Sequence, residues 1–308
     1  MPLEERFGID IIEVNPVDYS KVRTMAETST VTWHVVDVGQ RAAYQLGAPG
    51  LLEELDFSII DHRDIIAPVK DAPWSGGGAI TSSNVVAYNT DVYPEGTITS
   101  MSDFFDVNKV PGRGGVRDKA HFNVRMGVLG MNPDWIDDPD KRLLLAAPTD
   151  DLVDQSFAFW EEFKPNIDVF WHEGSECPQL LISGELEMCT ALNGRISDAQ
   201  KVGAPIAICW QCGRLISTDS WVIPKGLAEQ DPDKFYLAQL FLAWNTFPEV
   251  MVNHSKYISY GPTNLKALPL LETPEFDEVR DELPSSSANI RLAILEDERF
   301  TGSRIDEW

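Results

Sequence analysis

Strand-like and helical segments alternate along this chain, and that alternation restricts its possible folds more than any other feature. Residues 31–38 (VTWHVVDV) form a nearly continuous apolar run, which is typical of a strand buried on both faces. Other strands are predicted at 9–14, 79–89, 187–192 and 204–210, and residues 110–117 are predicted to form a turn followed by a strand. Helices are predicted at 19–27, 150–163, 176–183 and 233–245. This order predicts an α/β fold with largely parallel sheets.

No Pro- or Ser-rich linker divides the 308 residues into separate segments. If the chain forms two lobes, we therefore expect it to cross between them more than once. Such a topology predicts a cleft between the lobes, which is a common place for a small ligand to bind.

The charge balance argues against several classes of partner. The chain has 25 Lys and Arg against 49 Asp and Glu, which gives a formal net charge of −24. A field of this sign repels phosphate groups, so nucleic acids and anionic lipid surfaces are poor candidates. It favours cationic solutes, or serves only to keep the protein soluble. No apolar run reaches the roughly 18–20 residues of a membrane span.

The four cysteines leave several interpretations open. Cys209 and Cys212 form a C-x-x-C pair after a strand-like run, whereas a thioredoxin-like pair would open a helix. A zinc site would need two more ligands, and only Cys177, Cys189 and His172 are available at a distance. Structural or unpaired thiols are the first interpretation, disulfides the second, and a metal site the last. We therefore predict neither a metal site nor a cofactor.

Searches for catalytic motifs give nothing. The chain has no G-x-S-x-G nucleophile elbow, no phosphate-binding P-loop and no H-E-x-x-H pair. Its five histidines are scattered, and the Gly-rich stretches at 76–78 and 112–115 lack the spacing of a dinucleotide-binding motif. The sequence therefore predicts no catalytic residues and a protein that is not an enzyme.

The aromatic residues are more suggestive. Nine tryptophans and seven tyrosines occur, and several lie at predicted strand ends or in loops. An aromatic ring beside a carboxylate can hold an ammonium group through charge pairing and cation–π attraction. Asp219, which lies two residues before Trp221, is the best candidate for that arrangement. Packing in the core is the alternative role for any one of these rings.

A set of short motifs follows in order along the chain, beginning with residues 100–106 (SMSDFFD), 110–113 (VPGR) and 116–118 (VRD). They resemble the S-W-A-D-F-F-D, P-G-K and L-R-D motifs of the bacterial solute-binding proteins of polyamine-type ABC transporters. The remaining matches follow in family order: 183–185 (SGE), 192–195 (LNGR), 219–226 (DSWVIPKG), 260–264 (YGPTN) and 283–285 (LPS).

The resemblance implies a type II-like periplasmic-binding-protein fold, with two hinged lobes and a ligand cleft between them. Lobe one would comprise residues 1–87 and 215–261, and lobe two residues 88–214 and 262–308. The likeness begins after the strand that normally opens the family, so we expect the N-terminus to be truncated and the signal peptide to be missing. The resemblance also implies a periplasmic monomer that delivers a small cationic amine, such as putrescine or spermidine, to a membrane ABC permease.

The family's ligand-binding positions transfer only in part. Asp219 matches a carboxylate that holds a ligand amine, and Tyr260 matches an aromatic residue of the cleft. The other positions implied by the resemblance are Gln40, Arg41, Ser83, Asp118 and Asn193.

The sequence departs from the polyamine pattern at several of these places. Leu192 and Ser217 stand where the pattern has tryptophans, and Phe122 stands at an acidic position. A smaller amine, or a zwitterion whose carboxylate pairs with Arg41, fits the sequence as well as spermidine does. Two other classes remain as alternatives, an enzyme on a two-lobe α/β scaffold and a periplasmic partner protein that binds no solute.

Overall fold

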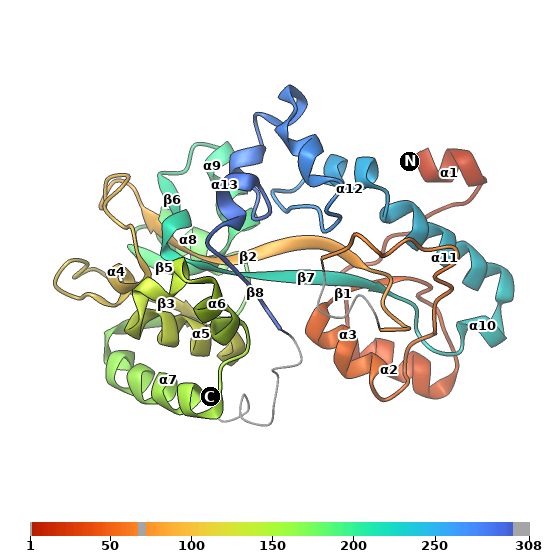
Figure 1. Ribbon diagram of the computed structural model, residues 1–308, viewed down its shortest axis with the longest axis horizontal. Helices are drawn as coiled ribbons and strands as arrows, with labels where there is room; N and C mark the ends of the chain where they lie inside the picture. The colour runs from red at the N-terminus through yellow and green to blue at the C-terminus, as the bar shows by residue number, and fades with distance from the viewer. Residues whose placement is uncertain (1, 67–71, 298–308) are drawn as a thin grey trace. The chain divides into compact units, whose positions relative to one another are not determined.

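A computed structural model describes residues 2–66 and 72–297 and shows a mixed α/β architecture (Figure 1). The contacts within it divide the chain into two compact units. Unit 1 comprises residues 1–81, 218–256 and 261–276, and unit 2 comprises residues 82–217, 257–260 and 277–308. The predicted α/β class is therefore confirmed. Each unit is described by itself.

Unit 1 is built around a short antiparallel ladder. Its helices and strand are α1 (Pro2–Phe7), α2 (Tyr19–Thr28), β1 (Val36–Gly39), α3 (Gln40–Gly47), α10 (Leu227–Gln230), α11 (Pro232–Asn245) and α12 (Pro248–His254), with the 3₁₀ turns Leu268–Glu272 and Pro274–Phe276. Strand β1 pairs with the unit 1 part of β7 (Arg214–Val222), with Val36 opposite Val222 and Gly39 opposite Asp219.

Burial alternates along both strands of this ladder. Val36, Val38 and Val222 enter a core with Val22 of α2 and Leu46 of α3. The residues between them face the other side of the ladder, because successive side chains of a strand point to opposite faces.

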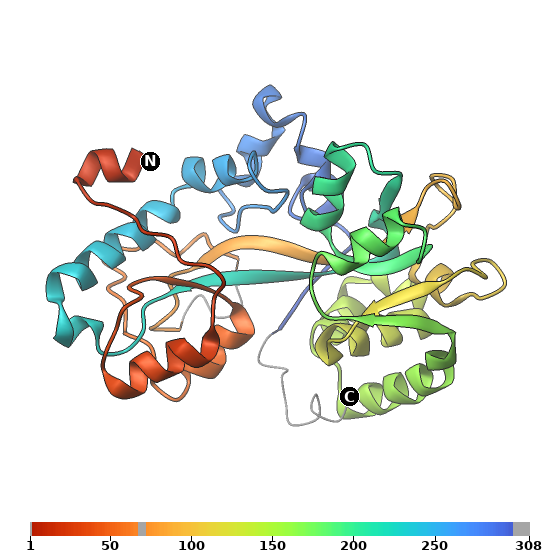
Figure 2. The ribbon, with the colours of Figure 1, turned by 180° about the vertical axis from the view of Figure 1, so that it is seen from behind.

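Unit 2 is larger and contains most of the strands. Its elements are α4 (Met101–Phe105), β3 (Gly114–Arg117), α5 (Ala120–Met131), α6 (Pro139–Ala146), α7 (Asp150–Phe163), β4 (Ile167–Trp171), α8 (Glu176–Ile182), β5 (Met188–Leu192), α9 (Asn193–Lys201), β6 (Ile206–Cys209), α13 (Ser287–Ile290) and β8 (Ala293–Leu295). Helices α5, α6 and α7 lie on one side of these strands and α8 and α9 on the other (Figures 1 and 2). Each side has its own buried apolar cluster.

The strand pairing is mixed, which corrects the prediction of largely parallel sheets. Strand β3 runs parallel to β4 and β5, and β8 runs parallel to β7. The long strand β2 (Gly78–Asn89) instead runs antiparallel to β5 and β6. Strands β2 and β7 each contribute residues to both units, so the chain passes from one unit to the other within strands.

Two strand predictions need correction, while the predicted helices at 19–27, 150–163 and 233–245 are confirmed. Residues 9–14 form no strand, and Ile12 is 85% exposed, because no neighbouring strand pairs with this segment among the described residues. The apolar run 31–38 becomes a strand only at Val36. That strand buries one face rather than two, since Asp37 and Gly39 alternate with the two valines.

Residues 262–276, which the sequence groups with lobe two, pack in unit 1 in the structure. Thr263 donates a hydrogen bond from Oγ1 to the carbonyl oxygen of Gly78 at 2.5 Å. Asn264 forms an isolated bridge with Ile65. These contacts tie the segment to unit 1 after Tyr260.

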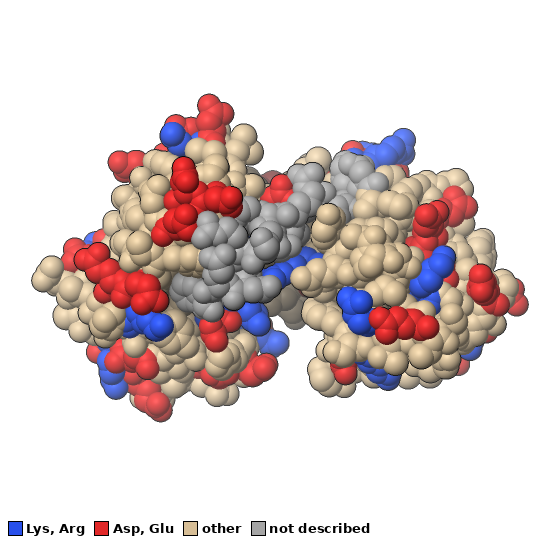
Figure 3. Space-filling model, turned by 90° about the horizontal axis from the view of Figure 1, so that it is seen from below, with Lys and Arg blue, Asp and Glu red and all other residues tan. Residues whose placement is uncertain are grey.

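Carboxylate side chains are spread over the visible face in Figure 3, with Lys and Arg side chains among them. Across residues 2–66 and 72–297, no helix has both the length and the apolar character that crossing a bilayer requires.

Candidate functional site

Two carboxylates lie side by side on the outer face of the β1–β7 ladder in unit 1. Asp37 is opposite Trp221, and Asp219 is opposite Gly39, so the four residues share one face of the ladder. Gly39 leaves room here, because a Cβ atom at this position would lie 3.7 Å from Oδ1 of Asp219. The face therefore presents two acids and one aromatic residue together.

Neither acid has a basic partner. Asp37 and Asp219 are partly buried, and no ion pair joins either one to a Lys, Arg or His of the described chain. Oδ1 of Asp37 is buried and accepts no hydrogen bond from any described residue. A desolvated carboxylate without a partner is costly, so this pair is suited to receive a cation.

The electrostatics of the pair follow from this burial. Loss of hydration raises the pKa of Asp219 to about 6. Loss of hydration also raises the pKa of Asp37 well above its ordinary value, and the nearby charge of Asp219 adds to that rise. Two acids that disfavour each other's ionisation are both stabilised by a positive charge placed between them.

A tyrosine borders the acid pair. Tyr19 begins α2, and its phenol contacts the backbone of Gly39. Loss of hydration raises the pKa of Tyr19, and the charges of Asp219 and Asp37 raise it further. The phenol is therefore close to both acids and stays neutral at physiological pH. Trp221 completes the face and packs edge-on against Phe241, with 5.2 Å between ring centroids.

The other two predicted residues of unit 1 begin helix α3. Gln40 is 1% exposed, and its Nε2 donates to Oγ of Ser220 at 2.6 Å. Ser220 lies on the opposite face of β7 from Asp219, so this contact of Gln40 is made behind the acid pair. Arg41 is partly exposed on the same helix.

In unit 2, two predicted residues are bonded to each other. Asn193, the first residue of α9, accepts at Oδ1 the backbone N–H of Ser83 at 2.9 Å. Its Nδ2 donates to the carbonyl oxygen of Ser259 at 2.6 Å. Oγ of Ser83 donates to the carbonyl oxygen of Leu215 at 3.2 Å, and both predicted residues are fully buried. Their polar groups thus hold the backbone of unit 2 in place.

The remaining predicted residues of unit 2 are more open. Tyr260 is partly buried, and its ring lies on Gly194, where an added Cβ atom would come within 2.6 Å of the ring. Asp118 follows β3, and its Oδ2 lies 3.6 Å from Nδ1 of His172. These residues border the end of β3, where Arg117 also lies.

The sequence interpretation missed Asp37 and Tyr19. Asp37 lies inside the run that was interpreted as a strand buried on both faces, so its carboxylate was not considered. Its place beside Asp219 depends on strand pairing across about 180 residues, which residue spacing along the chain does not reveal. The D-x-G pattern at the end of β1 is the local signal that could have identified it.

Of the four cysteines, one pair forms a disulfide and the other two remain free thiols. Cys209 and Cys212 form a disulfide at the turn between β6 and β7, while Cys177 and Cys189 are buried free thiols. Gly213 follows the disulfide with φ of +78°, a conformation that glycine adopts without strain. The C-x-x-C pair therefore stabilises a turn of unit 2.

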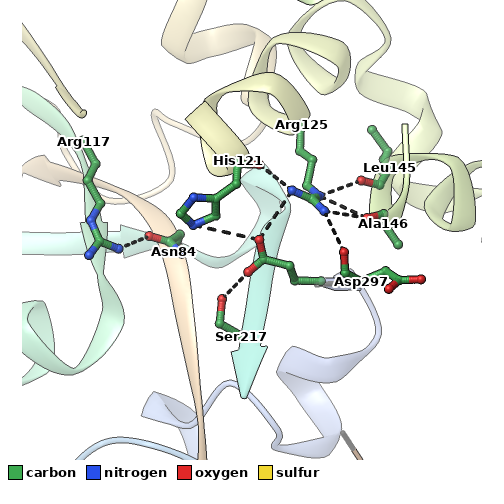
Figure 4. Close-up of polar contacts among 9 residues, drawn as sticks. Asn84, Arg117, His121, Arg125, Leu145, Ala146, Ser217 and Asp297 are labelled. Carbon is green, nitrogen blue, oxygen red and sulfur yellow. Dashed lines mark hydrogen bonds and ion pairs between the residues drawn. The ribbon is translucent and has the colours of Figure 1, made fainter. Parts of the chain in front are cut away.

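A buried ionic network anchors the C-terminal part of unit 2 (Figure 4). Arg125 of α5 and Glu296 are each 2% exposed, with 3.4 Å between Nη1 and Oε1. Arg125 also donates to the carbonyl oxygens of His121, Leu145 and Ala146. Glu296 accepts a hydrogen bond from Oγ of Ser217 at 2.7 Å. The network joins α5, α6, β7 and the segment after β8.

Comparison with known proteins agrees with this architecture. Residues 2–279 match the family model described as bacterial extracellular solute-binding protein. The chain is 32% identical over 285 residues to the gamma-aminobutyric acid-binding protein of Pseudomonas aeruginosa, covering 92% of this chain and 75% of that one. It is 24% identical over 294 residues to spermidine/putrescine-binding periplasmic protein 1 of Haemophilus influenzae, covering 90% and 75%.

Solved structures give the same assignment. An ABC transporter substrate-binding protein from Bradyrhizobium japonicum is similar with a TM-score of 0.85 and 30% identity, covering 99% of this chain and 89% of that chain. The Atu4243-GABA receptor is similar with a TM-score of 0.80 and 27% identity, covering 99% and 88%. The two-lobe periplasmic-binding-protein fold implied by the motifs is therefore confirmed. This chain belongs to the bacterial extracellular solute-binding proteins, the substrate-binding receptors of ABC transporters.

Proposed function

We propose that this receptor binds a small solute through a primary ammonium group, and that Asp37 and Asp219 hold that group. One observation carries the proposal: two adjacent, partly buried carboxylates have no basic partner in the described chain. A bound ammonium would supply the missing charge and hydrogen-bond donors. Tyr19 and Trp221 would contact the methylene groups next to it.

γ-Aminobutyrate is our first candidate solute. Two of the similar proteins are named for it, at 32% and 27% identity, whereas the similar spermidine/putrescine-binding protein is 24% identical. A polyamine carries several ammonium groups, each of which needs its own acidic partner. At one acidic position of the polyamine pattern this chain has Phe122, which is 3% exposed within the core of unit 2. Polyamine binding thus remains the competing prediction.

Calorimetric titration of the purified protein tests the proposal. At pH 7.5 we expect γ-aminobutyrate to bind at least about tenfold more tightly than putrescine or spermidine, a difference of about 1.4 kcal/mol. The reason is that one ammonium satisfies the pair of Asp37 and Asp219, whereas each further ammonium of a polyamine would need an acidic partner of its own. Binding of spermidine more tightly than γ-aminobutyrate would contradict this choice of solute.

Thermal unfolding provides an independent measurement of the same binding. A solute that binds only the folded protein must raise the unfolding temperature, by an amount that grows with the logarithm of its concentration relative to Kd. We expect such a rise with γ-aminobutyrate and none with butyrate at the same concentration, because butyrate has no ammonium. No rise with any amine would contradict the proposal and favour a partner protein that binds no solute.

A further inference from the structure

Two thiols of unit 2, Cys177 of α8 and Cys189 of β5, take no part in the proposed solute site. Both are fully buried, at 0% exposure, and belong to one apolar cluster with Leu181 and Ile196. Helix α8 packs against β5 in this cluster (Figure 1). The fold therefore brings together two cysteines that residues 178–188 separate in the sequence.

The two side chains contact each other, because a hydrogen bond joins the Cys189 thiol to the Cys177 thiol. On another side, the Cys189 sulfur lies over Gly115 of β3, where an added Cβ atom would come within 3.2 Å of it. Its Sγ also donates to the carbonyl oxygen of Thr190 at 3.1 Å. These contacts fix the sulfur of Cys189 beside that of Cys177.

Helix α8 is held in place by bonds that involve neither thiol. Nδ2 of Asn89 in β2 donates to the carbonyl oxygen of Leu181 at 3.0 Å. The N–H of Leu186, which precedes β5, donates to the carbonyl oxygen of Leu180 at 3.0 Å. The helix and the strand are therefore already positioned before any covalent bond joins them.

Burial determines when such a bond can form. Loss of hydration raises the pKa of the Cys189 thiol, and its hydrogen bond with Cys177 raises that pKa further. The thiolate, rather than the thiol, attacks a disulfide, and an oxidant cannot reach a side chain that is fully buried. Oxidation of this pair therefore belongs to folding, before the apolar cluster closes over the two sulfurs.

We infer that Cys177 and Cys189 are a second disulfide site of this receptor, which a disulfide oxidant closes while unit 2 folds. The inference goes beyond the proposed function and does not depend on it. The family is described as extracellular, and disulfides form and persist outside the cytoplasm. The structure shows the pair in its dithiol form, with the two sulfurs in contact.

The reaction is a double thiol–disulfide exchange. The thiolate of one cysteine attacks the S–S bond of the oxidant, forms a mixed disulfide and releases one thiol of the oxidant. The thiolate of the other cysteine then attacks the mixed disulfide, forms the Cys177–Cys189 bond and releases the second thiol. Two electrons pass from the protein to the oxidant, and the two protons of the cysteines end on the two released thiols.

Refolding of the reduced, denatured protein in a buffer of oxidised and reduced glutathione tests the assignment. The product is alkylated under denaturing conditions without reduction, and cleavage after Glu185 or Glu187 then places the two cysteines in different peptides. We expect these two peptides to be linked in at least about nine of ten molecules, because a buried disulfide is protected from reduction by the thiol pool. Closure of Cys209–Cys212 in the same sample shows that the oxidant is sufficient.

Thermal unfolding measures the effect of the bond on stability. The variant Cys209→Ala/Cys212→Ala removes the other disulfide, so Cys177 and Cys189 are its remaining cysteines. Its oxidised form should unfold about 5 °C or more above its reduced form, because the bond restricts the unfolded chain. The matched control adds Cys177→Ala/Cys189→Ala to this variant and should unfold at one temperature under both conditions.

Two results would overturn the inference. One is free Cys177 and Cys189 thiols in the refolded protein, or linkage of either cysteine to Cys209, to Cys212 or to glutathione. The other is an equal unfolding temperature for the oxidised and reduced forms of Cys209→Ala/Cys212→Ala, since a bond between sulfurs already in contact should stabilise the fold. Peptide mapping of the parent protein gives its answer even if the variants fail to fold.

Discussion

Asp219→Asn is expected to weaken γ-aminobutyrate binding by about 100-fold, or about 2.7 kcal/mol, and at the same time to stabilise the free protein. Asparagine keeps the shape of the side chain but removes the charge that would pair with the ammonium. The same charge is costly in the free protein, because Asp219 is desolvated beside Asp37. Affinity and stability should therefore change in opposite directions.

The sign of the stability change follows from proton binding. The pKa of Asp219 is raised to about 6 in the folded protein, from an ordinary value of 3.8. The folded protein therefore binds more protons than the unfolded chain between these two pH values, and its stability falls as the pH rises through this range. At pH 7.5 this cost is fully present, and a rise of about two pKa units corresponds to about 3 kcal/mol, so Asp219→Asn should increase the free energy of unfolding by up to about 3 kcal/mol. At pH 4 the increase should be close to zero.

Urea denaturation at both pH values measures this change, with Asp10→Asn as the control because Asp10 is exposed. The control should leave both affinity and stability unchanged. A variant Asp219→Asn that is less stable than the parent at pH 7.5, or that binds γ-aminobutyrate with the parent's affinity, would contradict the role assigned to this acid.

The second large effect concerns the buried ionic network of unit 2. Arg125→Met should lower the free energy of unfolding of that unit by about 3–5 kcal/mol, because it removes the guanidinium that faces the buried carboxylate of Glu296. It also removes the hydrogen bonds that the carbonyl oxygens of Leu145 and Ala146 accept. The double variant Arg125→Met/Glu296→Met should recover part of the loss, since it also removes the buried negative charge.

An exposed pair serves as the control for this measurement. Arg63 and Asp61 form a salt bridge at 2.7 Å with side chains 78% and 50% exposed, and Arg63→Met should cost less than about 1 kcal/mol. Chemical denaturation of all four proteins gives the comparison. A loss below 1 kcal/mol for Arg125→Met would show that the network contributes little to the stability of unit 2.

Local sequence patterns predict those helices and strands whose residues alone determine the structure, without a partner elsewhere in the chain. Helix α7 has acidic residues in its first turn and apolar residues at helical spacing, and it begins and ends where the pattern predicts. The segment 9–14 is rich in Ile and Val, but no strand of the described residues pairs with it, so its backbone stays irregular. Pairing partners, rather than propensity, decide whether such a segment becomes a strand.

The sequence predicts a residue of the candidate site only where a local motif identifies that residue. Asp219 was found because it lies in a recognisable motif and precedes Trp221. Asp37 acquires its significance from a neighbour that is distant in sequence, namely Asp219 across the β1–β7 ladder. Gln40 and Asn193 lie in the expected segments, but strand geometry and backbone hydrogen bonds decide where their amides point.

Proton release during binding is the most direct test of the central claim that an ammonium is held by a carboxylate pair with raised pKa values. Asp219, with a pKa of about 6, is about half protonated at pH 6 in the free protein, and an ammonium beside it should keep it ionised. Calorimetry of γ-aminobutyrate binding in buffers of different ionisation enthalpy should therefore detect release of about half a proton or more at pH 6. Binding that releases no proton at pH 6 would show that the ammonium does not bind at Asp37 and Asp219.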